Sequence, residues 1–484
     1  MSCGYMAYKP SSVFLNGSYW GIHNIREKFD KNYFSENFNA DPDNIDHLEY
    51  SRTETGTELL IVEGTMRHYN EMIDYLMSNN LNDPAIYDQV AEWIDIDSFI
   101  DHLVMTMYCA NTSWGHNREW WRPRTENGKW KWLIVDLDRG FNIFNVFTNL
   151  LDNLMEDYEL FNLLLNSSSF QNRFVQRASS HLNNTFHYQR INASVDSLSA
   201  IIASEMPRHI TKWGDQGGVS SMSDWEDELN EIKQFAENRT SIVRNQLSDE
   251  LELDETISVT INVEPSGSGK ILINDVPKID QGQVETFFKD IPISISAFPE
   301  PGYEFVGWEG ITDSNRIQYN CNSDGLFTAV FQFSDELILQ DVVTENTVLE
   351  RYQSYVVQED VTINPGVTLI ITEGVKISMP EDGNIIVEGQ LIINGTEQNP
   401  VEILPHSSVQ DNRWGAICFN NATDSSSLSH LKLEGASVGI DPSSHKGAIS
   451  GVNSDISISH VEIKDVLFPV YLEGGSLHIN QSSI

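Results

Sequence analysis

Two aspartates, two positions apart, end a segment that otherwise predicts a buried strand. Asp136 and Asp138 lie in "IVDLDRGF" (134–141), directly after the tryptophan-rich run "GKWKWL". An ionised carboxylate beside an apolar strand is costly unless it pairs with a cation or binds a metal ion. The spacing therefore indicates either a divalent-metal site or a structural ion-pair network.

A hairpin is predicted to bring an asparagine next to these aspartates. The dipeptide "NG" at 127–128 is the strongest short hairpin signal, because a two-residue type I′ turn needs positive φ at both positions. That turn would place Glu119 opposite Asp136, and Asn117 opposite Asp138. A bulge at the proline of the first strand could shift the pairing by one residue. In either register, the loop that carries Asn117 lies beside both aspartates.

The ligand chemistry of this predicted cluster suits a hard cation. Amide and carboxylate oxygens favour Mg²⁺ or Mn²⁺, with phosphate oxygens completing the coordination shell. Six basic residues lie on the hairpin, as a site that handles nucleotide phosphates would require: Arg118, Arg122, Arg124, Lys129, Lys131 and Arg139. The alternative is that Arg139 and its neighbours only neutralise Asp136 and Asp138, and spacing alone does not separate the two.

Composition limits the class of protein. A chain of 484 residues exceeds one hydrophobic core and predicts two to four domains. Its 71 acidic against 30 basic residues give a net charge of -41, which argues against nucleic acid as a partner and favours an exported protein. The four cysteines lie far apart without a CxxC pair, so neither a disulfide framework nor a zinc site is expected. No apolar run is long enough to predict a membrane span.

The order of predicted elements changes near residue 250. Before it, apolar residues follow a helical spacing, as in the helix predicted behind an Asp97 or Ser98 cap. After it, alternating residues predict strands throughout, with a small all-β domain over 256–334. The chain opens without a secretion signal and closes inside a repeating pattern, so both ends are expected to be clipped.

The last part of the chain, 345–484, is predicted to be a right-handed parallel β-helix, incomplete at its C-terminus. "LSHLKLEGASVGI" (428–440) returns 30 residues later as "ISHVEIKDVLFPV" (458–470). A unit that recurs at a fixed period buries its apolar face only by stacking on its neighbours. His430 and His460 occupy equivalent positions, which favours a structural ladder over a metal pair. The few scattered basic residues argue against a polysaccharide lyase.

Residues 1–250 resemble the spore coat protein H (CotH) kinase family. The similarity rests on "VFLNGSYWGIHNIREKFDKNYF", on the asparagine and Asp-x-Asp hairpin, and on the helical stretches that begin with "FQNRFVQRASSHLNNTF". The resemblance implies an α+β atypical protein-kinase-like fold, here N-terminally truncated and without its first strands. It also implies transfer of the γ-phosphate of ATP to Ser or Thr of secreted proteins.

The resemblance implies roles for individual residues. Asp136 corresponds to the aspartate that binds Mg²⁺ (or Mn²⁺), and Asn117 to the asparagine of the catalytic loop. Asp138 is expected to be a supporting ligand, and Arg139 to contact the ATP phosphates. Glu27 matches a family glutamate that would orient a nucleotide-side lysine or the metal, and its alternative role is to favour the dipole of a following helix.

The sequence departs from the family at the general base. The family's aspartate four residues before Asn117 is replaced here by Ser113, whose hydroxyl has no useful basicity near neutral pH. Phosphoryl transfer depends mostly on positioning and charge stabilisation, so the loss is expected to slow transfer without abolishing it. His116 and Glu119 are candidates to replace the base, and a packed structural histidine is the alternative for His116.

Residues 256–334 resemble the divergent internalin-type B repeat of bacterial surface proteins. The match rests on the closing strand "GYEFVGWEG", and its aromatic side chains are expected to form a small core more often than a ligand platform.

The predicted function is phosphorylation of an extracytoplasmic or surface protein. The alternative is a degenerate, non-catalytic domain in a cell-surface adhesin or scaffold whose β modules contact glycan. A third, weaker candidate is a polysaccharide-processing protein.

Overall fold

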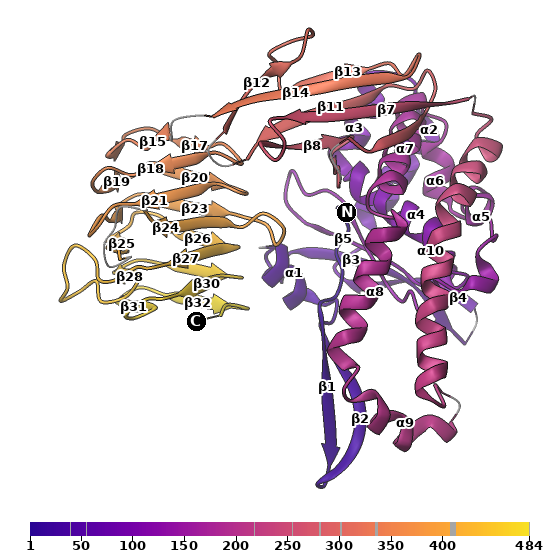
Figure 1. Ribbon diagram of the computed structural model, residues 1–484, viewed down its shortest axis with the longest axis horizontal. Coiled ribbons are helices and arrows are strands. Elements are labelled where there is room, and N and C mark those ends of the chain that lie inside the picture. The colour runs from indigo at the N-terminus through magenta and orange to yellow at the C-terminus, as the bar shows by residue number, and fades with distance from the viewer. Residues whose placement is uncertain are drawn as a thin grey trace. The chain divides into compact units, whose positions relative to one another are not determined.

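The computed structural model describes residues 1–484 except 39, 55, 217, 254, 280–281, 301–302, 334–336, 407–412 and 484. The chain divides into two compact units (Figure 1). The first contains residues 1–260, 272–295 and 317–326, and the second contains 261–271, 296–316 and 327–484. The predicted strand Gly302–Trp308 begins outside the described residues, because Gly302 is not among them.

The first unit is built around an antiparallel sheet of four strands in the order β4-β3-β5-β6. Three tryptophans lie fully buried in the main core: Trp120 on β5, Trp132 on β6, and Trp130 directly before β6. The strands are β3 (Ile45–Thr53), β4 (Gly56–Glu63), β5 (Arg118–Pro123) and β6 (Lys131–Leu133). Strands β1 (Tyr8–Leu15) and β2 (Ser18–Arg26) form a separate two-stranded hairpin.

Helices cover the sheet and supply most of the core. Their apolar residues recur at helical spacing, as expected for amphipathic helices. The helices are α1 (Lys31–Phe38), α2 (Arg67–Ser78), α3 (Pro84–Trp93), α4 (Ile96–Cys109), α5 (Leu150–Asp157), α6 (Glu159–Leu164), α7 (Ser168–Asn183), α8 (Tyr188–Ile202), α9 (Met206–Trp213) and α10 (Met222–Glu250), with the short 3₁₀ turns η1 (Trp114–His116), η2 (Ile143–Asn145) and η3 (Gly214–Gln216).

Helix α4 leads into the loop that carries Asn117. Its N-cap is Asp95, whose side chain accepts a hydrogen bond from the Ser98 amide at 3.0 Å, so the predicted cap at 97 or 98 is two to three residues late. Its C-cap, Ala110, adopts a left-handed φ of 53°. The helix is buried along most of its length, which fixes the start of the following loop.

Strands between 256 and 333 form two four-stranded sheets, ordered β10-β7-β14-β12 and β13-β11-β8-β9. Their residues are shared between the two compact units, so an independent small domain stays a prediction. These strands are β7 (Thr256–Glu264), β8 (Gly269–Ile273), β9 (Val276–Pro277), β10 (Val284–Phe288), β11 (Ile293–Pro299), β12 (Tyr303–Trp308), β13 (Arg316–Tyr319) and β14 (Gly325–Phe333).

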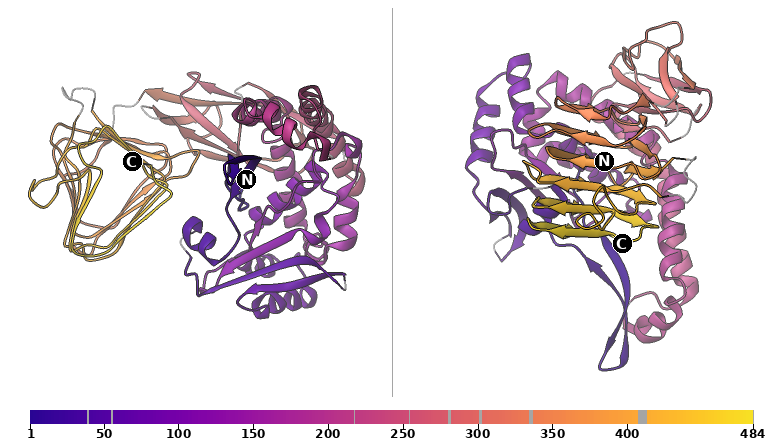
Figure 2. Two further views of the ribbon diagram at one scale, coloured as in Figure 1. Left: turned by 90° about the horizontal axis from the view of Figure 1, so that it is seen from below. Right: turned by 90° about the vertical axis from the view of Figure 1, so that its left-hand side faces the viewer.

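Three parallel six-stranded sheets follow, as in a parallel β-helix (Figure 2). Aliphatic side chains at equivalent positions stack inside it: Ile377, Ile403, Leu433 and Ile463. The strands are β15 (Leu337–Ile338), β16 (Val342–Val343), β17 (Thr347–Leu349), β18 (Ser354–Val356), β19 (Val361–Ile363), β20 (Thr368–Thr372), β21 (Lys376–Met379), β22 (Ile385–Val387), β23 (Gln390–Asn394), β24 (Val401–Pro405), β25 (Ile417–Asn420), β26 (Ser426–Ser429), β27 (Leu431–Glu434), β28 (Ile449–Val452), β29 (Ile456–Ser459), β30 (Glu462–Lys464), β31 (Val470–Glu473) and β32 (Leu477–Asn480).

Two smaller expectations can be compared with the structure. The His430 and His460 rings stack with their centroids 4.4 Å apart and their planes 14° apart, which is the geometry of a ladder. All four cysteines are buried and none forms a disulfide. Within the described ranges, none of the helices combines the length and hydropathy that a bilayer-spanning segment requires.

Candidate functional site

The structure brings Asn117 and Asp136 into contact. The Asn117 side-chain amide donates to Asp136 Oδ2 at 3.1 Å and to Ser113 Oγ at 3.2 Å. Ser113 Oγ in turn donates to Asn111 Oδ1 at 2.9 Å, and Asn111 Nδ2 donates to the Asp136 carbonyl at 3.1 Å. A closed ring of hydrogen bonds therefore joins the loop after α4 to the loop after β6.

The hairpin that carries this contact differs from the predicted one. β5 and β6 pair Glu119 with Leu133, so the predicted pairing of Glu119 with Asp136 is wrong. Neither residue of the "NG" dipeptide has positive φ, and the turn closes instead with the Gly128 amide donating to the Thr125 carbonyl at 3.1 Å. Asp136 thus lies beyond the end of β6, where it reaches Asn117 from a loop.

The cause of the shifted register is a tertiary contact. The Trp130 amide donates to the Trp93 carbonyl at 2.8 Å, and its carbonyl accepts from the Asp95 amide at 3.0 Å. These bonds tie residue 130 to the segment between α3 and α4 and remove it from the hairpin ladder. Long-range hydrogen bonds therefore override the local turn preference.

Backbone strain gathers around the contact. Asp136 has φ 45°, Phe141 has φ 56°, and Ala110 at the end of α4 has φ 53°. Left-handed conformations of residues other than glycine are unfavourable, by about 1–3 kcal/mol each, and they occur often at functional sites. The Phe141 amide donates to the Cys109 carbonyl at 2.8 Å, which fastens the loop after β6 to the end of α4. The loop is therefore held by several independent bonds.

The two aspartates are not neutralised by arginine. The side chains of Asp138 and Arg139 are exposed and make no hydrogen bond or ion pair with any described residue. The carboxylate of Asp136 is bonded to the Asn117 amide and to no basic side chain among the residues described. The structure therefore does not show the ion-pair network that was the alternative at this site.

Five of the six basic residues of the hairpin have structural partners. The Arg118 guanidinium lies 4.1 Å from the Tyr50 ring centroid and 4.4 Å from that of Tyr158, inside the core. Arg122 pairs with Asp46 at 3.2 Å. The remaining three bond elsewhere: Arg124 to the Asp43 carbonyl, Lys129 to the Ala91 carbonyl and Lys131 to Asp95. The prediction that all six serve phosphate is wrong, and Arg139 alone is exposed without a partner among the described residues.

The structure places Glu27 at the base of the β1–β2 hairpin. Its carboxylate accepts from the Ala7 amide at 2.7 Å and from the Asn37 side-chain amide at 3.3 Å. Helix α1 begins at Lys31, and Asp30 accepts hydrogen bonds from its first amides. The alternative role of Glu27 in the helix dipole is therefore wrong, because Asp30 takes that position.

The two candidate replacements for the general base lie in different surroundings. His116 is half-buried in η1 and makes no hydrogen bond to a described side chain. Glu119 is bonded to the buried His47 ring at 3.0 Å. Burial, and then the nearby Glu119 carboxylate, raise the pKa of Glu49 on the neighbouring strand. Glu119 is thus engaged with β3, while His116 remains next to Asn117.

The donor set fits a magnesium ion better than a zinc ion. Among the described residues, no group of three or more His, Cys, Asp or Glu side chains is placed to hold a metal. Mg²⁺ takes one or two carboxylates and completes its shell with water and phosphate oxygens. Asp136 and Asp138 could supply carboxylate oxygens, and a rotated Asn117 amide would present its oxygen in place of its nitrogen.

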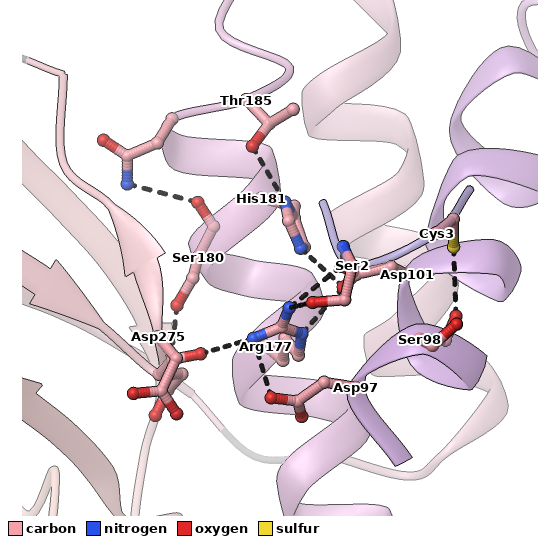
Figure 3. A network of polar contacts seen from close by, with 12 residues as sticks. Ser2, Cys3, Asp97, Ser98, Asp101, Arg177, Ser180, His181, Thr185 and Asp275 are labelled. Atoms are coloured by element: carbon pink, nitrogen blue, oxygen red, sulfur yellow. Dashed lines mark hydrogen bonds and ion pairs between the residues drawn. The ribbon is translucent and has the colours of Figure 1, made fainter. Parts of the chain in front are cut away.

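The structure contains a buried polar network that the sequence analysis missed (Figure 3). The Arg177 guanidinium donates to both Asp101 oxygens, at 2.7 and 2.9 Å, and His181 Nε2 lies 2.8 Å from Asp101 Oδ1. All three side chains are almost completely buried. Arg177 and His181 are four residues apart on α7, so they share one helix face, which was the available signal. The network locks α4, and with it the start of the site loop, to α7.

Loss of the Asp101 carboxylate is expected to destabilise the first unit strongly. Burial opposes its ionisation, but His181 and Arg177 outweigh burial and hold the pKa of Asp101 well below its usual range. Asp101→Asn removes the buried carboxylate that contacts both Arg177 and His181, and it leaves the arginine only Asp97, at 3.3 Å, as a counter-ion. The loss costs about 3–5 kcal/mol of unfolding free energy. Urea unfolding followed by tryptophan fluorescence measures this, because only Trp308 and Trp414 of the eleven tryptophans follow residue 250. Equal stability in Asp101→Asn and in the exposed-site control Asp152→Asn would contradict the prediction.

A second prediction concerns the stability of the first unit at acidic pH. Burial, and then Arg118, lower the pKa of His102 to about 4, and its ring contacts the carbonyl of Leu133 at the end of β6. An unfolded histidine titrates near pH 6.5. Below that pH the unfolded chain therefore binds a proton at His102, while the native ring stays neutral. The contribution of His102 to the free energy of unfolding is therefore fully present above about pH 6.5. It is lost as the pH falls, by about 2 kcal/mol between pH 7 and pH 5. His102→Gln should reduce this difference in urea unfolding, and an unchanged slope would count against the assignment.

Comparison with known proteins identifies a family that the first part of the chain is similar to. The family model described as CotH kinase protein matches residues 4–243 of the chain. The matched range includes the loop after α4, the hairpin and the loop after β6, and so Ser113, Asn117 and Asp136. No curated protein matches the chain in sequence.

Proposed function

From the match of residues 4–243 to the CotH kinase family, we propose that this part of the chain is a kinase-like domain that transfers phosphate from ATP. The observation that carries the proposal is the 3.1 Å contact between the Asn117 amide and Asp136. Two loops separated in sequence converge there, and no arginine among the described residues pairs with Asp136 or Asp138. The geometry supports a site for a divalent cation and phosphate oxygens.

Each residue has a proposed role in this site. Asp136 would hold Mg²⁺ or Mn²⁺, and the Asn117 side-chain oxygen could serve as a further ligand. Asp138 orients ligand waters or adds an oxygen of its own, and Arg139 contacts the ATP phosphates. A bound Mg²⁺ supplies charge stabilisation for the transferred phosphoryl group. The acceptor that we propose is a Ser or Thr hydroxyl of an extracytoplasmic or surface protein, since the chain is strongly acidic and suits an exported protein.

Ser113 positions the Asn117 side chain and does not accept the proton of the acceptor hydroxyl. Its hydroxyl accepts from Asn117 and donates to Asn111, so it holds the amide beside Asp136. A neutral hydroxyl cannot accept the proton of the acceptor at neutral pH. Transfer is therefore slow, and His116, adjacent to Asn117, is the nearest titratable group in the sequence that could assist it.

The same serine favours a second candidate function. A domain that keeps its metal-binding acids but lacks the base can bind Mg–ATP without transferring phosphate. In that case the chain is a non-catalytic scaffold or adhesin, and its parallel β-sheets provide the surface that contacts protein or glycan. Ser113 is the observation that favours this second candidate.

Incubation with γ-labelled ATP tests the proposal. The full chain, with dephosphorylated casein as an acidic acceptor, should become labelled on Ser or Thr in Mg²⁺ and not in EDTA. Binding of a fluorescent ATP analogue is measured in parallel. Binding without label would favour the non-catalytic candidate, and neither binding nor label would overturn both.

A further inference from the structure

The β1–β2 hairpin and helix α9 form an acid-free region in an acidic chain. The chain has one acidic residue in about seven, yet residues 1–26 and 206–213 contain none. The two segments do contain basic side chains: Lys9, Arg26, Arg208 and Lys212. We call β1, β2 and α9 the hairpin surface. Its charge is opposite to that of the chain as a whole.

Helix α9 covers one edge of the hairpin. Figure 1 shows β1 and β2 projecting from the four-stranded sheet, with α9 beside β2. The Ile22 amide donates to His209 Nδ1 at 3.0 Å, and the Trp213 indole donates to the Trp20 carbonyl. The two indole rings pack edge to face with centroids 5.2 Å apart. Two outer backbone groups of β2, the Ile22 amide and the Trp20 carbonyl, are therefore bonded to α9.

The outer edge of β1 is open. In the described structure β1 pairs with β2 and with no other strand. Ser12 lies opposite Ile22, whose amide points away from β1 towards α9, so the Ser12 backbone also points away from its partner strand. Pro10 has no N–H, which limits the usable edge to residues 11–15. Phe14 and Leu15 on this stretch are 51% and 47% exposed.

Two cations of α9 lie over aromatic rings of the hairpin. The Arg208 guanidinium lies 4.0 Å from the Tyr19 ring centroid and 5.0 Å from that of Phe14. The Lys212 ammonium lies 5.2 Å from the Trp20 ring centroid. Neither cation forms an ion pair with a carboxylate among the described residues, although Glu205 lies near Tyr19 at the start of α9. Both charges remain available to an anionic partner.

We propose that the hairpin surface binds an extended, acidic polypeptide segment, which adds to β1 as a third strand. The open backbone edge matches a polypeptide, because only a second strand presents alternating N–H and C=O groups at the same spacing. Phe14 and Leu15 contact apolar side chains of the segment, and Arg208, whose guanidinium reaches the Phe14 ring of β1, contacts its carboxylates. Lys212, over Trp20 on the β2 side, adds to the positive charge of the hairpin surface. This inference does not depend on phosphate transfer.

A labelled peptide of alternating valine and glutamate tests the proposal, with its valine–lysine counterpart for comparison. Fluorescence anisotropy with the full chain should show binding of the acidic peptide alone. Ser12→Pro removes an outward N–H without touching a bond between β1 and β2, and it should weaken binding at least about tenfold. The double variant Arg208→Gln, Lys212→Gln should weaken binding about tenfold and reduce its salt dependence. Arg67→Gln, an exposed cation on α2, is the matched control and should leave binding unchanged.

Several results would overturn the proposal. Equal affinity for the lysine peptide would exclude charge complementarity, and unchanged binding in Ser12→Pro would exclude strand addition. A dimer in sedimentation equilibrium that Ser12→Pro dissociates would show that the occupant is a second copy of the chain. The double cation variant leaves the backbone intact, so it decides the question if Ser12→Pro fails to fold.

Discussion

Asp136→Ala is expected to lower Mg²⁺-dependent phosphate transfer by about 10³-fold or more. The variant removes the carboxylate that is proposed to hold the metal, and with it the partner of the Asn117 amide. Several kcal/mol of charge stabilisation in the transition state depend on a correctly placed cation. Transfer of label from γ-labelled ATP to casein, measured as an initial rate, gives the effect.

The control for this variant lies on the same hairpin. Glu126 is exposed in the turn and makes no hydrogen bond or ion pair to a described residue. Glu126→Gln removes one negative charge, as Asp136→Ala does, and should transfer phosphate at the wild-type rate. Unchanged labelling in Asp136→Ala, with Glu126→Gln equal to it, would exclude Asp136 from the site.

Ser113→Asp is expected to raise the rate of phosphate transfer by about 10²–10⁴-fold. The substitution places a carboxylate where the resemblance to the CotH kinase family implies a general base. Because the Ser113 hydroxyl already accepts from the Asn117 amide at 3.2 Å, a carboxylate at this position can keep that bond while it accepts the proton of the substrate hydroxyl. The rate of casein labelling at saturating ATP measures the gain.

Ser113→Asn separates basicity from hydrogen bonding. Asparagine has nearly the same size as aspartate and can accept from Asn117, but it has no basic oxygen. It should give no increase in rate, and only Ser113→Asp should show a rate that rises with pH through the pKa of a carboxylate. Equal rates in Ser113→Asp and Ser113→Asn would mean that a proton acceptor is not what the domain lacks.

The central contact of the site could be predicted from sequence, but not the turn that produces it. The proximity of Asn117 and Asp136 follows from any hairpin between them, whatever its register. The predicted type I′ turn is wrong because the Trp130 backbone is hydrogen-bonded to Trp93 and Asp95. Local sequence does not predict hydrogen bonds between segments that are distant in the chain. The same limit hid the partners of the basic residues, since Arg118 stacks on Tyr50 and Tyr158 only in the folded chain.

Repeats were easier to predict than buried charge. The parallel sheets follow from a pattern that recurs along the chain, as in the stacked rings of His430 and His460. The Asp101–Arg177 pair joins helices that are far apart in sequence, and both residues resemble ordinary surface positions. A sequence pattern fixes which helix face a residue occupies but not which other helix lies against that face.

The most direct test of the central claim is the number of Mn²⁺ ions bound in the presence of ATP. Electron paramagnetic resonance counts free Mn²⁺ and so gives the bound fraction for the full chain and for variants. The account predicts a nucleotide-dependent site that Asp136→Ala removes, that Asn117→Ala weakens and that Glu126→Gln leaves intact. Equal Mn²⁺ binding by the wild type and Asp136→Ala would contradict it.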